Sequence, residues 1–113
     1  MSELAKMKCS ASRGDEPPAT PEEIEEMLGD LPDWEVIEVE GEKRLTRLFE
    51  FKNFAAALQF TNQVGEAAEE EGHHPKLVTE WGRVGVSWWT HKIGGLHQND
   101  FIMPAKTDQL YSG

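Results

Sequence analysis

The chain has 113 residues and a formal net charge of -10 at pH 7, and its composition is ordinary for one globular domain with one core. A charge of this sign repels a phosphate backbone and anionic lipids, so we expect neither direct nucleic-acid binding nor membrane association. Cys9 is the only cysteine and no apolar run reaches the roughly 18 residues of a membrane-spanning helix, and both features are typical of a cytoplasmic protein.

The N-terminal region is expected to divide into a tail and a helix. Residues 1–19 are mostly small and polar and are interrupted by proline, so we expect a flexible tail before a single domain over residues 20–113. Thr20 and Glu23 have the spacing of a capping box, which predicts a helix that ends before Pro32. Its apolar stripe consists of Ile24, Met27, Leu28 and Leu31.

A β-hairpin is expected next. Residues 34–39 and 45–51 have strand composition, and residues 40–43 between them suit a turn. Arg47 interrupts the otherwise apolar face of the second strand, so we expect it to lie at an edge of the sheet.

A long helix follows over residues 53–71, with Asn53 as its cap. Three acidic residues at its C-terminus oppose the helix dipole, which suggests that at least one of them, such as Glu69, has another use. The residues at helical spacing that predict its packed face are Phe54, Ala57, Leu58, Thr61, Val64, Gly65 and Ala68.

The last third of the chain predicts a second hairpin and a final helix. Residues 77–81 and 84–90 form the two strands, and residues 98–110 form the helix. Antiparallel hairpins beside long helices predict an α+β fold with two layers, a sheet and a layer of helices.

All four histidines lie between Glu69 and the final helix, which makes this the region most informative about function. A lone histidine is more often a surface or satisfied core residue than a catalytic one. Adjacent residues of an extended chain point to opposite faces, so His73 and His74 cannot both bind one ion without a bend. Pro75 restricts His74 to extended conformations and strengthens this expectation.

Two other site chemistries have weaker support in the sequence. A zinc site formed by His73, Glu69 and His91 is geometrically possible, but the sequence has neither a cysteine pair nor a His-Glu-x-x-His motif. A serine hydrolase is disfavoured because there is no Gly-x-Ser-x-Gly motif and Ser87 falls within a predicted strand.

The order and spacing of Glu69, His73-His74-Pro75, Trp81, His91 and Asp100 form a specific pattern. It resembles the signature of the pterin-4a-carbinolamine dehydratases, and the similarity covers residues from about 20 to 111 of this chain. This resemblance implies a four-stranded antiparallel sheet with three helices on one face. It also implies a homodimer or homotetramer and the conversion of a 4a-hydroxytetrahydropterin to quinonoid dihydropterin and water. No metal or organic cofactor is expected.

The resemblance assigns roles to individual residues. His73 and His91 are the acid-base candidates, and His74 is mainly a substrate ligand within the catalytic set. The residues expected to line the pterin site are His73, His74, Pro75, Thr90 and His91, and those expected to support it are Glu69, Asp100 and Trp81. A histidine with an unperturbed pKa near ~6.5 exchanges protons close to neutral pH, which suits this reaction. Asp100 has a second interpretation as an acidic residue at a helix N-terminus, and His97 is expected to cap that helix or to be solvated.

Two departures from the family pattern concern the ends of the chain. Cys9 and Ser12 stand where many prokaryotic-type members carry a Cys-x-x-Cys motif. Pro104 lies within the last predicted helix, where proline costs about 3 kcal/mol unless the helix kinks. The second functional hypothesis is a non-catalytic pterin-binding or protein-interaction module of the same fold, for example one that supports a molybdopterin enzyme.

Overall fold

The computed structural model describes residues 18–111, apart from the side chain of His91. The expected tail therefore lies largely outside the described residues. The elements in chain order are α1 (Pro21–Leu28), β1 (Glu35–Val39), β2 (Glu42–Glu50), α2 (Phe54–Glu71), β3 (Lys76–Glu80), β4 (Arg83–Trp88), the 3-10 helix η2 (His91–Ile93) and α3 (Asn99–Leu110).

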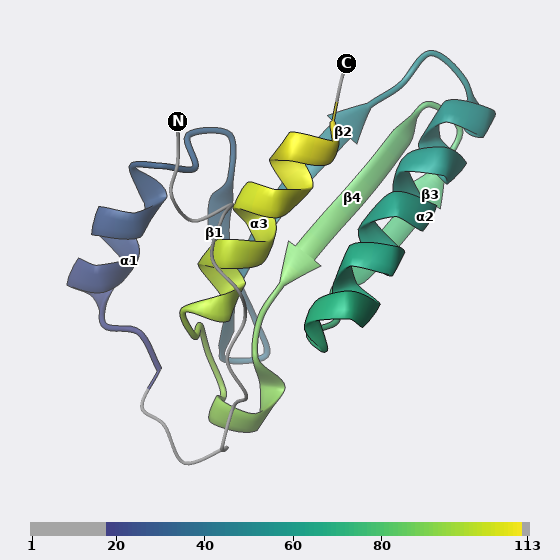
Figure 1. The fold of residues 1–113 in the computed structure, drawn as a ribbon. Helices are drawn as coiled ribbons and strands as arrows, with labels where there is room; N and C mark the ends of the chain where they lie inside the picture. The colour runs from purple at the N-terminus through teal and green to yellow at the C-terminus, as the bar shows by residue number, and fades with distance from the viewer. Residues whose placement is uncertain (1–17, 112–113) are drawn as a thin grey trace.

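The four strands form one antiparallel sheet in the order β1-β2-β4-β3 (Figure 1). Helices α2 and α3 lie side by side across one face of the sheet, and α1 lies at the β1 side of the molecule (Figure 1). The predicted α+β class, with four antiparallel strands and three helices, is confirmed. β2 and β4 pair in the middle of the sheet. The pair of Leu45 and Trp88 marks one end of these two strands, and the pair of Glu50 and Arg83 marks the other.

Local signals explain where α1 and the first hairpin begin and turn. Thr20 and Glu23 form the predicted capping box through reciprocal side-chain to backbone hydrogen bonds of 3.2 and 2.9 Å. The hairpin turn is shorter than expected, because Val39 already pairs with Glu42. Positive φ angles at the two turn residues fit the tight turn that such a two-residue loop requires.

The packed face of α2 differs from the predicted one. Ala57, Val64 and Ala68 are buried as expected, but Phe60 is buried as well, while Phe54 and Leu58 are exposed. The prediction was wrong because the apolar stripe was centred on the side of α2 that carries Phe54 and Leu58, whereas the buried side carries Phe60. The neighbouring side faces the edge strand β3, and there Thr61 forms a 2.6 Å hydroxyl contact with Thr79.

Arg47 lies within the sheet's helix-covered face rather than at a sheet edge, so the edge expectation was wrong. β2 pairs with β1 on one side and β4 on the other, and Arg47 points toward α3 with Leu45 and Phe49. Its guanidinium donates to Asp108 Oδ1 at 2.7 Å, and Trp34 Nε1 donates to the same oxygen at 2.9 Å. The charge is tolerated because an acid on α3 pairs with it.

Helix α3 continues from Asn99 to Leu110 through Pro104 without ending. A proline at this position has no N–H to donate to the carbonyl of Asp100, four residues earlier. The cost is offset by burial, since almost every residue from Asn99 to Thr107 packs against the rest of the molecule. Phe101 and Met103, on either side of Ile102, lie in the core.

The sheet face opposite the helices is largely uncovered in the single chain. Leu48 on β2 is 55% exposed and Val78 on β3 is 50% exposed. β1 and β3 are the edge strands. Within the described residues, no helix is both long and apolar enough to cross a membrane.

Candidate active site

The end of α2 directs the two adjacent histidines to different places. Gly72 has a φ of 67°, a left-handed conformation that glycine adopts without strain, and the N–H of His73 bonds back to the carbonyl of Ala68 at 3.2 Å. This turn brings His73 inward, against the start of α3. His74 points away and is exposed. The two imidazoles therefore occupy opposite sides of the extended segment, as residue alternation predicts.

A buried carboxylate lies at the centre of the site. Asp100 is 0% exposed, and Oδ1 lies 2.6 Å from Nε2 of His73. Its other oxygen, Oδ2, accepts from the hydroxyl of Thr90 at 2.7 Å and from the backbone N–H of His97 at 2.9 Å. Three groups from three parts of the chain thus converge on one carboxylate. Asp100 is also an acidic residue in the first turn of α3, which agrees with its second interpretation.

This arrangement determines which nitrogen of His73 carries a proton when the ring is neutral. Oδ2 of Asp100 receives two donors, as suits an ionised carboxylate, and an ionised carboxylate can only accept, so Nε2 of the neutral His73 ring is the N–H that donates to Oδ1. The lone pair of the neutral ring is then on Nδ1. A histidine held in this tautomer can accept a proton at Nδ1 and later return it.

His97 supports the same carboxylate through its backbone and caps α3 with its ring. Nδ1 of His97 accepts from the backbone N–H of Asn99 at 3.1 Å, and the residue is buried. Of the two expectations for His97, capping is therefore correct and solvation is wrong.

His74 pairs with Glu69 through a short contact between Nε2 and Oε1. Glu69 lies in the last turn of α2, and both side chains are exposed. This contact gives one of the three C-terminal acids of α2 the separate use that the dipole conflict suggested. A zinc site that includes both His73 and Glu69 would need these side chains to face each other. Instead, Glu69 faces His74 and His73 faces Asp100.

The remaining predicted site residues are distributed unevenly. Thr90 follows β4 and is held by an isolated bridge to Gly95, with its hydroxyl on Asp100. His91 comes directly after Thr90 and begins η2, so its backbone adjoins the site, while its side chain lies outside the described structure. Pro75 precedes β3 immediately after the histidine pair.

Trp81 is not brought to the histidines within this chain. It lies in the turn between β3 and β4 and is 70% exposed. His73 and Thr90 lie at the opposite end of β4, about 20 Å away for a six-residue strand.

Trp88 lies beside the site, although it was not among the residues that the sequence pattern predicted there. Its ring is stacked on the ring of His73, with centroids 5.7 Å apart and an interplanar angle of 17°. The signal was available, because Trp88 and Thr90 are two residues apart in a strand and therefore share the face that carries Thr90 to Asp100.

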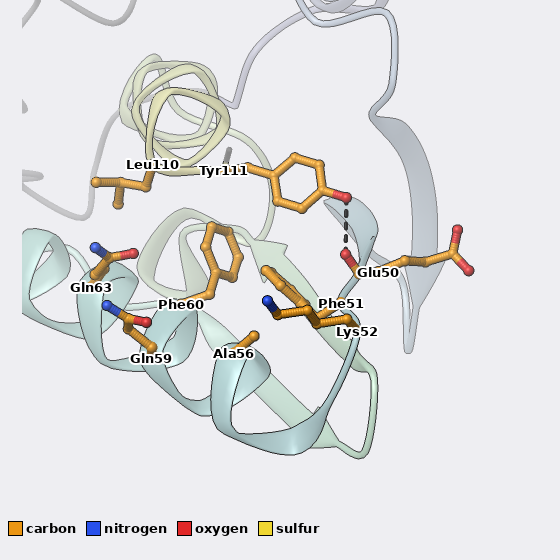
Figure 2. A pocket seen from close by; sticks show the side chains of 9 residues that line it. All are labelled: Glu50, Phe51, Lys52, Ala56, Gln59, Phe60, Gln63, Leu110 and Tyr111. Carbon is orange, nitrogen blue, oxygen red and sulfur yellow. Dashed lines mark hydrogen bonds between the residues drawn. The ribbon is translucent and has the colours of Figure 1, made fainter. Parts of the chain in front are cut away.

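A hollow lies at the other end of the two helices, away from Asp100 (Figure 2). It has a volume of about 770 Å³ and lies between the first half of α2 and the end of α3. Phe51, Phe60 and Tyr111 pack their rings together there, and the hydroxyl of Tyr111 donates to the carbonyl of Glu50 at 3.0 Å. None of the predicted site residues lines it. The proton-transfer chemistry is therefore expected at the opposite end, near Asp100.

No group of three His, Cys, Asp or Glu side chains that could hold a metal ion occurs in the part of the chain that the structure describes.

Comparisons with known proteins agree with the spacing pattern and with the fold. Residues 17–110 match the family model described as pterin 4 alpha carbinolamine dehydratase. A relative from Microcystis aeruginosa, provisionally named a pterin-4-alpha-carbinolamine dehydratase, is 58% identical over 98% of this chain and 96% of its own. A relative from Saccharophagus degradans with the same provisional name is 57% identical over the full length of both chains.

Two solved structures share the fold. A protein from Brucella melitensis, described as a transcriptional coactivator/pterin dehydratase, has a TM-score of 0.74 and 33% identity, covering 82% of this chain and 97% of that one. A pterin dehydratase-like protein described as a RuBisCO assembly factor has a TM-score of 0.60 over 72% of this chain and 92% of its own. At 18% identity, the second likeness concerns the fold alone.

Fold and site together define a small α+β protein with a buried carboxylate that holds a histidine. The family match covers most of the chain, and the chain belongs to the pterin 4 alpha carbinolamine dehydratase family.

Proposed function

We propose that this protein is a dehydratase that converts a 4a-hydroxytetrahydropterin (a 4a-carbinolamine) to quinonoid dihydropterin and water by histidine acid-base catalysis. In this role it recycles pterin for an aromatic amino-acid hydroxylase. The observation that carries the proposal is the His73–Asp100 pair. A buried carboxylate engages Nε2 of the histidine and leaves Nδ1 as the proton acceptor.

The reaction requires two proton movements at one ring. The bond from carbon 4a to the hydroxyl oxygen breaks, and a proton joins the leaving hydroxyl to make water. A second proton leaves the adjacent ring nitrogen, and a carbon–nitrogen double bond forms. Oxidation and reduction are balanced within the substrate, so the step needs an acid and a base but no electron acceptor.

The residues of the site can supply both groups. His73 accepts the proton from the ring nitrogen at Nδ1, because its other nitrogen donates to Asp100. His91, directly after Thr90, protonates the leaving hydroxyl. His74 and Pro75 contact the substrate from the segment that leads into β3, with Glu69 orienting His74.

Asp100 and Thr90 act indirectly in this scheme. Thr90 donates its hydroxyl hydrogen to Asp100, so its main contribution is to orient that carboxylate rather than to bind the pterin. Asp100 in turn orients His73 and stabilises the positive ring after proton transfer. Trp81, although part of the matching motif, has no role at this site within a single chain.

A stopped-flow dehydration assay with chemically prepared 4a-hydroxytetrahydropterin tests the proposal. We expect the purified protein to accelerate water loss and to retain that activity in the presence of a metal chelator. Activity that a chelator abolishes and zinc restores would favour a metal mechanism instead. No acceleration over the spontaneous reaction would remove the dehydratase assignment.

The expected setting is a cytoplasmic homodimer or homotetramer with no direct nucleic-acid contact. The two edge strands and the uncovered sheet face provide surfaces for self-association. The formal charge of -10 opposes direct contact with a phosphate backbone.

The second candidate function is a non-catalytic pterin-binding or protein-interaction module, for example one that supports a molybdopterin enzyme. It is favoured by the descriptions of the two fold relatives, which name a transcriptional coactivator and an assembly factor. An interaction module does not require a histidine oriented by a buried carboxylate. Calorimetry that shows pterin binding, together with an inactive dehydration assay, would support this candidate over the enzyme.

A further inference from the structure

The ring of His73 is held by two different contacts. Nε2 bonds to Asp100, and one face of the imidazole lies against the indole of Trp88 at a centroid distance of 5.7 Å and an interplanar angle of 17°. Trp88 is fully buried at the last position of β4, so the surface against which His73 rests is part of the protein core.

The hydrogen bond alone leaves the orientation of the imidazole weakly defined. Rotation about the Cβ–Cγ bond of a histidine has a broad energy profile. Nε2 lies nearer to the axis of that rotation than Nδ1 does. A limited turn of the His73 ring that its bond to Asp100 tolerates therefore moves Nδ1 further than Nε2 and changes the direction of its lone pair. A flat surface parallel to the ring removes this freedom.

We propose that Trp88 is a positioning residue that sets the ring plane of His73 and thereby the direction of its free Nδ1 atom. The inference rests on the proposed function for its catalytic consequence, but the geometry of His73 can be measured without it. Asp100 selects the tautomer, and Trp88 selects the plane. Proton transfer needs both, because the lone pair must be on Nδ1 of His73 and must point at the proton that it accepts.

The indole N–H of Trp88 supports a role for the ring face rather than for a hydrogen bond. Nε1 of Trp88 has no hydrogen-bond partner among the residues that the structure describes. Burial of an unpaired N–H is unfavourable, so a tryptophan at this position is not explained by hydrogen bonding. Its large flat area against His73 is the feature that phenylalanine can replace and an aliphatic side chain cannot.

The test compares Trp88→Phe with Trp88→Leu by kinetics and by nitrogen-15 NMR of the His73 ring. Trp88→Phe should keep kcat within about threefold and keep the Nε2–H tautomer predominant. Trp88→Leu should lower kcat by about tenfold or more with KM changed less than threefold, and its His73 signals should keep that tautomer but broaden, because the ring is no longer held in one plane. Should Trp88→Leu not fold, Trp88→Met fills more of the volume without offering a flat face.

Phe49→Leu is the matched control, because it removes a buried ring from the same core near the other end of the sheet. It should lower the melting temperature but leave kcat and the His73 tautomer unchanged. Equal losses of kcat in Phe49→Leu and Trp88→Leu would overturn the inference, as would full kcat with sharp His73 signals in Trp88→Leu.

One measurement needs no variant. In the unmutated protein, the stacked indole should shift the ring protons of His73 upfield, and unshifted protons would contradict the stack. An inactive wild-type protein with the expected His73 signals would remove the dehydratase proposal and leave the positioning role of Trp88 intact.

Discussion

Nε2 of His73 lies 2.6 Å from Oδ1 of Asp100, although the two residues are 27 positions apart in the chain. The contact joins the segment that leaves α2 to the first turn of α3, and the β3–β4 hairpin lies between them in sequence. Both helices pack on the same face of the sheet, which brings these two ends together. The geometry of the site therefore depends on how α2 and α3 pack against each other.

Replacement of Asp100 by asparagine should test the tautomer assignment. With the amide nitrogen facing His73, Nε2 of the imidazole must accept rather than donate, and the proton moves to Nδ1. We expect kcat to fall by about 10²-fold or more with a smaller change in KM. Steady-state kinetics and nitrogen-15 NMR of the His73 ring measure the two effects.

The control for this variant is Thr90→Ser, which keeps the hydroxyl that donates to Asp100. It should retain most of the activity. Unchanged kcat in Asp100→Asn, with its His73 ring now protonated at Nδ1, would show that the free lone pair is not used.

His91→Ala and His74→Ala should separate catalysis from binding. If His91 transfers a proton in the transition state, His91→Ala should lower kcat by about 10²- to 10⁴-fold, with KM changed much less. His74→Ala should mainly raise KM, because His74 is exposed and paired with Glu69 rather than oriented by a buried acid.

Both epimers of the substrate should be assayed, since the two faces of the pterin can depend on different histidines. A kcat for His91→Ala within threefold of the parent on both epimers would remove His91 from the catalytic role.

Asp108 should give the folded state a specific pH dependence. Burial raises the pKa of Asp108 above its usual 3.8, despite the donors Trp34 and Arg47. As pH rises through that value the unfolded chain releases this proton first, so the contribution of Asp108 to stability falls with rising pH. Wild type should therefore lose stability relative to Asp108→Asn as pH rises from below 3.8, the usual pKa of the side chain, toward neutral pH.

Urea unfolding of both proteins across that range measures the difference in the free energy of unfolding. A wild type that instead gains stability relative to Asp108→Asn would show that pairing with Arg47 outweighs burial.

Deletion of residues 1–17 should leave the melting temperature and the dehydration rate nearly unchanged. Residues 1–17 have no apolar periodicity in their sequence, so we expect them to add little to the buried core. Pro18 and Ala19 are retained, because the N–H of Ala19 bonds to the carbonyl of Leu96 at 2.7 Å. A fall of many degrees in melting temperature would assign the tail a structural role.

The protein should be a homo-oligomer in solution. Among residues 18–111, β1 and β3 are the edge strands of the sheet, and apolar side chains such as Leu48 and Val78 are exposed on the face opposite the helices. Light scattering at micromolar concentration should give a mass of two or four chains. A mass of 12.8 kDa, that of one chain, would contradict this expectation.

The spacing of a few residues predicted more of this molecule than its periodicity did. The capping box at Thr20 and the order of elements follow from local rules that the final packing obeys. Phe60 was missed because several adjacent stripes of a long, alanine-rich helix are apolar, and only the position of the sheet decides between them. Arg47 was misplaced because its partner, Asp108, is 61 residues away and no local pattern links them.

The side chains that meet at Asp100 come from the region between His73 and Asp100, and β1 and β2 contribute none of the contacts described for that carboxylate. The outward face of the first hairpin can therefore change in evolution without altering the proton-transfer groups. Selection for a new binding partner and selection for turnover would then act on separate parts of the chain. One gene could acquire the first property without losing the second.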